Sequence, residues 1–170
     1  PDTFPLDELK YSLSKEDILI AGPESSISSM TELNVGYIDF RDMDGGDFSF
    51  GLNLPAGYIN LEGDESITVS FDTTDLDSET FTVSNIRLVN VPADYEVSLI
   101  TNAIRGVRVY GSTQALASLT ASDLVAEVDL SSGDLSTGSS SVIVNIYAPG
   151  KGLVWCSGTY RVQISVQEKN

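Results

Sequence analysis

Two groups of carboxylates are the residues of this chain best placed by type and spacing to do chemistry. Clustered carboxylate oxygens are the ligands that calcium prefers in proteins. An EF-hand loop beginning at Asp42 would need an acceptor fifth, glycine sixth and glutamate twelfth, where the chain has Gly46, Asp47 and Asn53. The first group is therefore more typical of a solvated turn, and the second of a flexible acidic linker that calcium could stiffen. The candidate ligands are Asp42, Asp44 and Asp47 in the first group and Asp72, Asp75, Asp77 and Glu79 in the second.

Histidine is absent from the chain, and Cys156 is its single cysteine. This excludes Ser-His-Asp and Cys-His catalysis and zinc sites built on histidine. A lone cysteine beside Trp155 in an apolar run is expected to be a buried, inert thiol. A glycosidase would need two acids facing each other across a bond, and no spacing here brings a particular pair together. We therefore expect no enzymatic activity and no cofactor.

The net charge of the chain is −16 and is unevenly distributed. Residues 1–80 hold 18 acidic and 3 basic side chains, net −15, and residues 81–170 hold 7 and 6, net −1. Such a chain repels phosphate backbones, so a nucleic-acid partner is excluded. Four aromatic side chains could instead form a platform for a glycan, although packing within a sheet is their commoner use. They are Tyr95, Tyr147, Trp155 and Tyr160.

The elements that must position these residues repeat along the chain. Gly106–Leu130 reads as a strand, a glycine, a short helix capped by Ser112 or Thr113, a turn and a second strand. Ile18–Phe40 has the same order, and its Gly22 stands 89 positions before Gly111. A repeat of this length predicts two tandem domains rather than a solenoid. Leu116 and Leu119 are expected on the inner side of the second helix, with Ile27 and Met30 as their counterparts.

Short alternating runs predict an all-β fold with one short helix in each domain. We expect domains at 1–75 and 80–168, joined by a linker at 73–80. The strand predicted at 81–91 has no counterpart in the first domain, whose N-terminal strand is expected to be truncated. No apolar run exceeds four residues, so no membrane-spanning segment is predicted. The other expected strands are 9–13, 48–54, 58–61, 67–71, 95–99, 142–146, 153–155 and 160–166, with Phe4-Pro5 resembling Val91-Pro92.

The second copy, from about Phe81 to Val166, resembles a YbbR-like repeat. The matching segments are LVNVPADYEV and VRVYGSTQALASLTASDLVAEVDLS. The first copy fits through ILIAGPESSISSM and YIDF. Together the two copies cover nearly the whole chain, and the order of these short segments carries the resemblance.

The resemblance implies β-rich tandem repeats with a fold similar to the C-terminal domain of the ribosomal L25 group. Such repeats lie outside the cytoplasmic membrane behind one N-terminal transmembrane helix. The best-understood members, called CdaR, associate with a membrane-bound diadenylate cyclase and modulate its production of cyclic di-AMP. We therefore expect an extracytoplasmic protein-interaction module whose membrane tether lies outside these residues. The alternatives are a surface adhesin or glycan-binding β module and a calcium-stiffened spacer.

Overall fold

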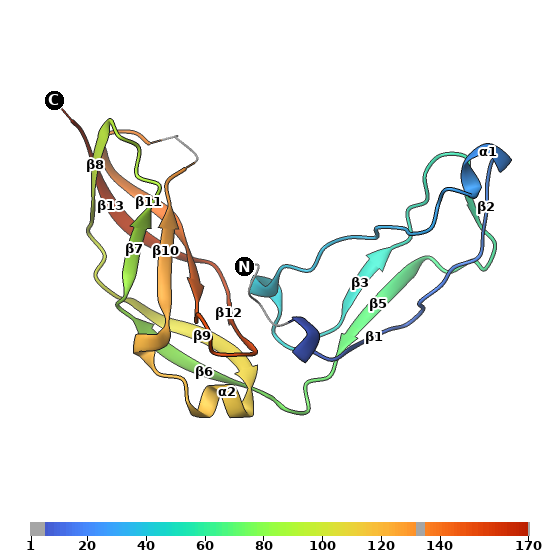
Figure 1. Cartoon of the computed structure of the whole chain (residues 1–170), viewed down its shortest axis with the longest axis horizontal. Coiled ribbons are helices and arrows are strands. Elements are labelled where there is room, and N and C mark those ends of the chain that lie inside the picture. Colours follow the sequence, from blue (N-terminus) through green and yellow to red (C-terminus); the bar gives the residue numbers. More distant parts are fainter. Residues whose placement is uncertain (1–5, 132–134, 170) are drawn as a thin grey trace. The chain divides into compact units, whose positions relative to one another are not determined.

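The structure, a computed structural model, describes residues 6–131 and 135–169. The chain folds into two compact units (Figure 1). The N-terminal unit comprises Leu9–Asp39 and Gly45–Thr73, and the C-terminal unit comprises Phe40–Asp44, Thr74–Asn170 and Pro1–Glu8, as far as these are described. Strands dominate both units, so the predicted all-β class is confirmed. Within the described ranges, no helix is long and apolar enough to cross a membrane.

The N-terminal unit contains a three-stranded antiparallel sheet and a separate strand pair. The sheet has the order β1-β5-β3, and β2 pairs antiparallel with β4. In β3 the Phe48 and Phe50 side chains are half-buried and their neighbours exposed, the alternation expected of a one-sided strand. The elements are β1 (Tyr11–Leu13), β2 (Ile20–Ala21), α1 (Glu24–Ile27), β3 (Phe48–Gly51), β4 (Ile59–Asn60) and β5 (Ser66–Phe71).

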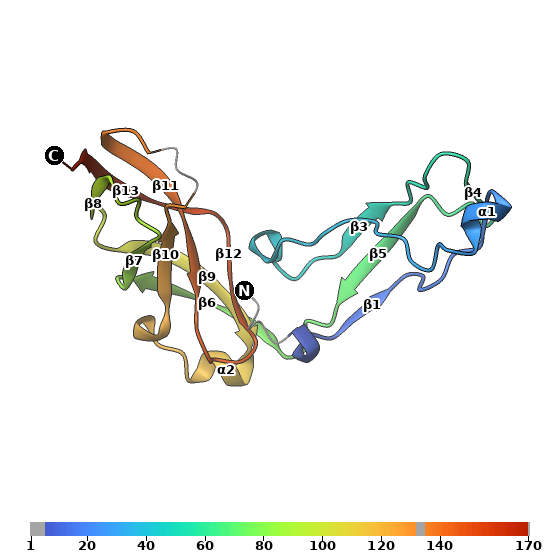
Figure 2. The same cartoon turned by 45° about the horizontal axis from the view of Figure 1, so that its top comes forward.

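The C-terminal unit has a five-stranded sheet of order β7-β10-β11-β13-β8 and a three-stranded sheet of order β12-β9-β6. The β9 and β6 strands lie side by side in Figures 1 and 2. The β7 and β10 strands pair in parallel and the other neighbours are antiparallel. The strands are β6 (Leu76–Val83), β7 (Ile86–Val89), β8 (Tyr95–Leu99), β9 (Ile104–Ser112), β10 (Val125–Asp129), β11 (Gly138–Tyr147), β12 (Val154–Ser157) and β13 (Tyr160–Glu168). Its helices are η1 (Leu6–Glu8), η2 (Phe40–Asp42), α2 (Thr113–Ala117) and η3 (Ala121–Asp123).

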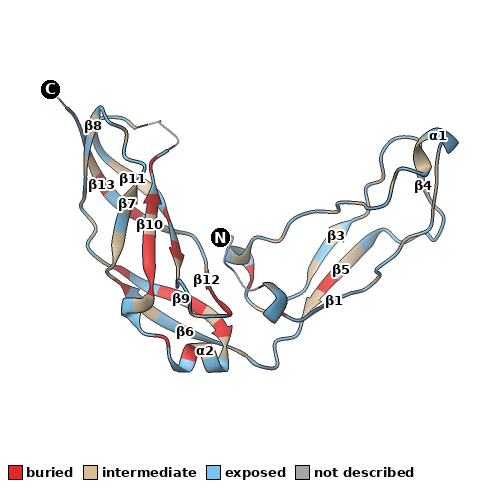
Figure 3. Ribbon diagram, in the orientation of Figure 1, coloured by how far each residue is buried: buried red, intermediate tan, exposed pale blue. Residues whose placement is uncertain are grey.

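The main hydrophobic core lies in the C-terminal unit, where side chains from both of its sheets pack together (Figure 3). The β9 strand shows how the sequence builds it, because Val107 and Val109 are fully buried while Arg108 between them is exposed. Strict alternation thus places one face of the strand in the core and the other outside it.

The strand–glycine–helix–turn–strand order predicted for Gly106–Leu130 is confirmed. The Ser112 hydroxyl caps α2 by accepting a hydrogen bond from the Ala115 amide at 3.2 Å. Leu116 and Leu119 are both buried in the core. The η3 turn carries a capping box between Thr120 and Asp123, which fixes the start of the returning strand.

Two predicted elements are wrong. The second strand of the unit predicted at Ile18–Phe40, expected at 38–40 to match Val128–Leu130, is absent, and Phe40 instead opens η2. Its counterpart in the second copy, β10, is paired on both sides by β7 and β11, and the described residues of the N-terminal unit hold no strand equivalent to β7. The linker predicted at 73–80 is largely the strand β6, which pairs with β9 from Leu76 onward. Because β6 is an edge strand, Asp77 and Glu79 can point into water.

The strand predicted at 81–91 is also divided, because β6 ends at Val83 after a register irregularity and β7 begins at Ile86. The strand predicted at 9–13 is confirmed for Tyr11–Leu13. The comparison of Phe4-Pro5 with Val91-Pro92 lies outside the described residues. The domain boundaries 1–75 and 80–168 stay a prediction.

The two units nevertheless share an arrangement of paired strands. The order β1-β5-β3 in the first matches β8-β13-β11 in the second, antiparallel throughout. The β2–β4 pair matches the β9–β12 pair in the same way. This common order is what a duplicated domain would produce, and it supports the repeat read from the sequence.

Candidate functional site

The outer face of the β9–β12 pair carries a stacked pair of aromatic rings. Tyr110 and Trp155 are opposite each other in register, with ring centroids 5.7 Å apart and planes 13° apart. Phe40 meets Trp155 edge-on at 6.0 Å. The Trp155 indole Nε1 donates a hydrogen bond to the Met43 carbonyl at 3.2 Å, and the Met43 side chain is completely buried.

The segment Phe40–Asp44, which we call the docking turn, is fastened to this face by its main chain as well. The Arg41 carbonyl accepts hydrogen bonds from the Gly158 amide at 2.8 Å and from the Ser157 hydroxyl at 3.2 Å. Apolar contacts and main-chain hydrogen bonds thus both hold the turn, which covers Trp155 on the outer face of β9–β12 and leaves Arg108 exposed.

Two glycines show which residues correspond in the β2–β4 pair. A Cβ atom on Gly111 would lie 2.5 Å from the carbonyl oxygen of Leu153, which precedes Val154, the residue paired with Gly111 in β12. A Cβ atom on Gly22 would lie 2.5 Å from the Tyr58 ring in the same way. Glycine at both places allows a neighbouring group to approach closely, namely the Leu153 main chain at Gly111 and the Tyr58 ring at Gly22.

Counting residues from Gly22 and Gly111 along the two strand pairs shows which residues of β2–β4 lie on its outer face. Ala21 and Ile59, opposite each other in register, take the places of Tyr110 and Trp155. Leu19 and Leu61 take the places of Arg108 and Ser157, and the Leu61 amide donates to the Leu19 carbonyl at 2.9 Å.

This outer face is apolar and uncovered. We call its three large side chains, Leu19, Ile59 and Leu61, the β2–β4 patch. They are exposed to 59%, 64% and 56% respectively. Single exposed apolar side chains are ordinary, but three adjoining large apolar side chains on one sheet face are typical of a binding surface.

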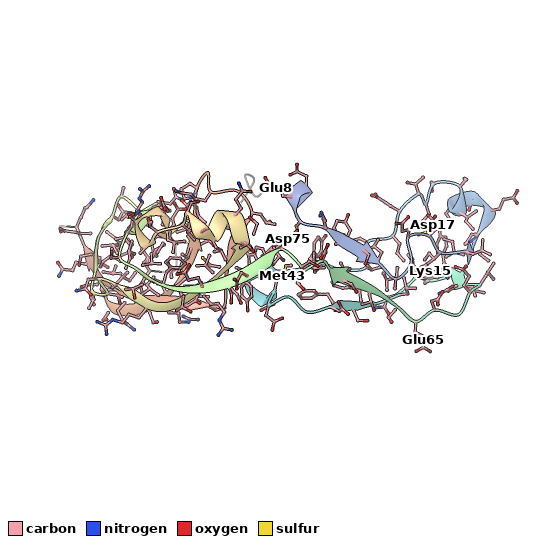
Figure 4. All side chains as sticks on the ribbon, turned by 90° about the horizontal axis from the view of Figure 1, so that it is seen from below. Glu8, Lys15, Asp17, Met43, Glu65 and Asp75 are labelled. Atoms are coloured by element: carbon pink, nitrogen blue, oxygen red, sulfur yellow. The ribbon has the colours of Figure 1, made fainter. Side chains whose placement is uncertain are left out.

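Polar contacts beside the patch, several of them made by Lys15 (labelled in Figure 4), hold its loop in place. The Lys15 ammonium forms ion pairs with Glu62 at 3.0 Å and Asp64 at 2.5 Å, and the Glu62 carboxylate accepts a hydrogen bond from the Leu19 amide at 2.8 Å. The Asn60 side chain donates to the Asp64 carbonyl at 2.7 Å. The Leu19 amide and then Lys15 lower the pKa of Glu62, and Asp64 and Glu62 raise the pKa of Lys15. These contacts order the loop that presents Leu61.

The carboxylates predicted as calcium ligands are not brought together. Across residues 6–131 and 135–169, no three His, Cys, Asp or Glu side chains gather closely enough to hold a metal ion. Asp77 accepts a hydrogen bond from the neighbouring Ser78 amide, and the Asp75 carbonyl accepts one from the Thr113 amide. The arrangement therefore gives the calcium candidates no support. Asp42, Asp44, Asp75 and Asp77 belong to the C-terminal unit, and Asp47 and Asp72 belong to the N-terminal unit.

The four aromatic side chains considered as a glycan platform pack within the C-terminal unit instead, which is the use we expected to be commoner. Trp155 is only 5% exposed because the docking turn covers it. The Tyr147 hydroxyl donates to Glu127 at 2.9 Å, which raises the pKa of Tyr147. The Tyr160 hydroxyl donates to the Ser157 carbonyl, and Tyr95 packs against the main core.

Cys156 is buried in the main core, as predicted. Burial alone raises the pKa of its thiol to about 12. The thiolate that would act as a nucleophile or a metal ligand is therefore strongly disfavoured.

Sequence reasoning missed the β2–β4 patch and the docking turn. The patch could have been found by extending the repeat from Gly22 through the neighbouring strand, since Ile59 then falls at the place of Trp155. The docking turn has no such signal, because FRDMD reads as an ordinary polar turn.

No family model matches the chain, and no curated protein matches it. Among solved structures, it is similar to the YbbR-like domain of the lmo2119 protein from Listeria monocytogenes. The sequence identity is 21%, the match covers 55% of this chain and 96% of that one, and the TM-score is 0.39. That domain is described as YbbR-like, which is also the repeat type that the sequence resembles.

Proposed function

We propose that the chain is a non-enzymatic protein-interaction module. The β2–β4 patch is the observation that supports this, because large apolar side chains held in water by an ordered loop favour contact with another protein. The net charge of −16 makes nucleic acid an unsuitable partner.

The resemblance to YbbR-like repeats supplies the finer part of the proposal. On that basis the chain belongs to the extracytoplasmic part of a membrane-anchored regulator and modulates a membrane-bound diadenylate cyclase. Its repeats would engage a partner or a wall component, and the membrane helix would transmit that contact to the cyclase. The support for this step is the segment VRVYGSTQALASLTASDLVAEVDLS.

The test is to co-express the whole gene product with the membrane-bound diadenylate cyclase of the same genome in a host that makes no cyclic di-AMP. We expect the two proteins to co-purify and the cyclic di-AMP per cyclase to differ from that of the cyclase alone. If neither occurs, the cyclase is the wrong partner and only the general module proposal remains.

A paired substitution tests whether the patch matters to that partner. Ile59→Asp with Leu61→Asp places charge in the β2–β4 patch. Ile143→Asp, at an exposed position of the C-terminal unit, is the matched control. Loss of an effect on cyclic di-AMP in the first variant alone would assign the cyclase contact to the patch.

A further inference from the structure

We infer that the β2–β4 patch is the seat of a second docking turn, presented by another domain of this repeat type that precedes it in the polypeptide. The proposed function says only that the β2–β4 patch contacts another protein, and the inference specifies which kind of domain that is. It rests on the interaction role of the patch and does not depend on the cyclase.

The first step is that the corresponding face of the C-terminal unit is covered by a segment from much earlier in the chain. Met43 and Trp155 are 112 positions apart, yet their hydrogen bond is buried. The outer face of β9–β12 is therefore completed by a turn whose sequence belongs to the preceding copy. The same strand pair in that preceding copy has a face of the same kind and lacks this cover.

The second step is the chemistry of the turn. It contributes an aromatic ring and an unbranched apolar side chain three residues apart, Phe40 and Met43, and it offers the Arg41 carbonyl to the strand below. A 3-10 turn places residues three apart on the same side. The expected occupant of the patch is therefore a turn of this spacing.

The third step is that the patch has room and apolar surface for such a turn. Ala21 stands where the C-terminal unit has Tyr110, and Ile59 stands where it has Trp155. The smaller side chains leave space beside the sheet. Leu19 and Leu61 extend the apolar area to positions that are polar in the other unit.

The fourth step excludes the turns that this chain itself contains. The docking turn is already seated, since Met43 is 0% exposed. The equivalent segment of the second copy begins at Leu130, which is 3% exposed and part of the main core. A second copy of the chain would have to release its docking turn, or draw Leu130 out of the main core, before either could fill the patch.

The experiment places the photo-crosslinker p-benzoyl-L-phenylalanine at position 59 of the whole gene product, expressed in its own cells, and identifies the linked peptide by mass spectrometry. We expect an intramolecular link to a turn with an aromatic and an apolar residue three apart. The crosslinker at position 143 is the matched control and should not link to that turn.

Hydroxyl-radical footprinting supplies a second measurement without a substitution. In the whole gene product, oxidation of Leu19, Ile59 and Leu61 should fall to the level of buried Val69. In residues 1–170 alone, it should stay at the level of exposed Ile143.

Three results would overturn the inference. A link to residues 40–44 of a second copy would make the patch an interface between copies, and unchanged oxidation with no link would leave it uncovered. A link to a cyclase would overturn the inference while supporting the proposed function. A link to a repeat turn, with cyclic di-AMP unaffected, would support the inference while the cyclase proposal fails.

Discussion

The two units are built from the same strand pairs but bury very different amounts of apolar surface. The C-terminal unit has a core cluster of seventeen buried residues, whereas the buried apolar residues described in the N-terminal unit are Leu9 and Val69. What the C-terminal unit adds is β6, β7 and β10, which pair with or pack against the shared strands. The shared pairs thus define the fold, and the additional strands supply most of the core.

The exposed residues show the same contrast. Of the nine large hydrophobic side chains that are exposed in the described chain, six lie in the N-terminal unit. Three of these six adjoin in the β2–β4 patch, and adjoining exposed apolar side chains are typical of a face that contacts another protein. The six are Tyr11, Leu13, Leu19, Tyr37, Ile59 and Leu61.

The largest effect is expected from a substitution in the large hydrophobic core of the C-terminal unit. Leu124, which joins η3 to β10 in the sequence, is fully buried in the main core. Leu124→Ala should therefore lower the unfolding free energy of the C-terminal unit by about 2–5 kcal/mol. Urea denaturation followed by the fluorescence of Trp155, the single tryptophan, measures this because Trp155 lies in the C-terminal unit.

The matched change in the other unit is Val69→Ala. It should cost about 1–2 kcal/mol, since each buried methylene contributes roughly 0.8 kcal/mol. Hydrogen exchange of the β5 amides measures this loss. Equal losses in the two variants would contradict the view that the units differ in core rather than in strand pairing.

Substitutions at the two corresponding glycines sharpen the comparison further. Gly111→Ala should destabilise the C-terminal unit by about 1–3 kcal/mol, because the new methyl group meets the Leu153 main chain, which cannot move aside. Gly22→Ala should cost less, because the obstacle is the Tyr58 side chain, which can rotate. The midpoint of thermal unfolding, read by circular dichroism, distinguishes the two, and a larger loss for Gly22→Ala would contradict the assigned correspondence.

The elements with strong local signals were predictable from the sequence. Ser112, Gly111 and the alternation of β10 each determine their own conformation within a few residues, and the structure agrees with them. The predictions failed where strand pairing between segments far apart in the sequence overrides the local amino-acid composition. Asp77 and Glu79 suggest a linker, yet β6 pairs with β9 because an edge strand tolerates charge on its solvent side.

The candidate site was less predictable for the same reason. Trp155 and its neighbouring tyrosines suggest an exposed platform only if nothing covers them, and the cover is a turn 112 positions away. A local sequence pattern cannot predict a contact between residues that are so far apart in the chain. The apolar residues of β4, in contrast, were visible as an alternation, but only the pairing with β2 shows which of them face outward.

The smallest expected effect concerns the capping box of η3 in the C-terminal unit. Lys151 and then Thr120 lower the pKa of Asp123 to about 2 from its ordinary 3.8. The ionised carboxylate therefore stabilises the folded unit above the unfolded pKa, and this contribution is lost as the pH falls from near 3.8 through 2. Asp123→Asn removes the charge, so the urea midpoint reported by Trp155 should fall less between about pH 5 and pH 2 in this variant than in the unaltered chain. Asp94→Asn, at an exposed carboxylate outside the capping box, is the control and should keep the full decline. An unchanged decline in Asp123→Asn would mean that other carboxylates, such as Asp129 held by Asn90, carry the acid sensitivity of this unit.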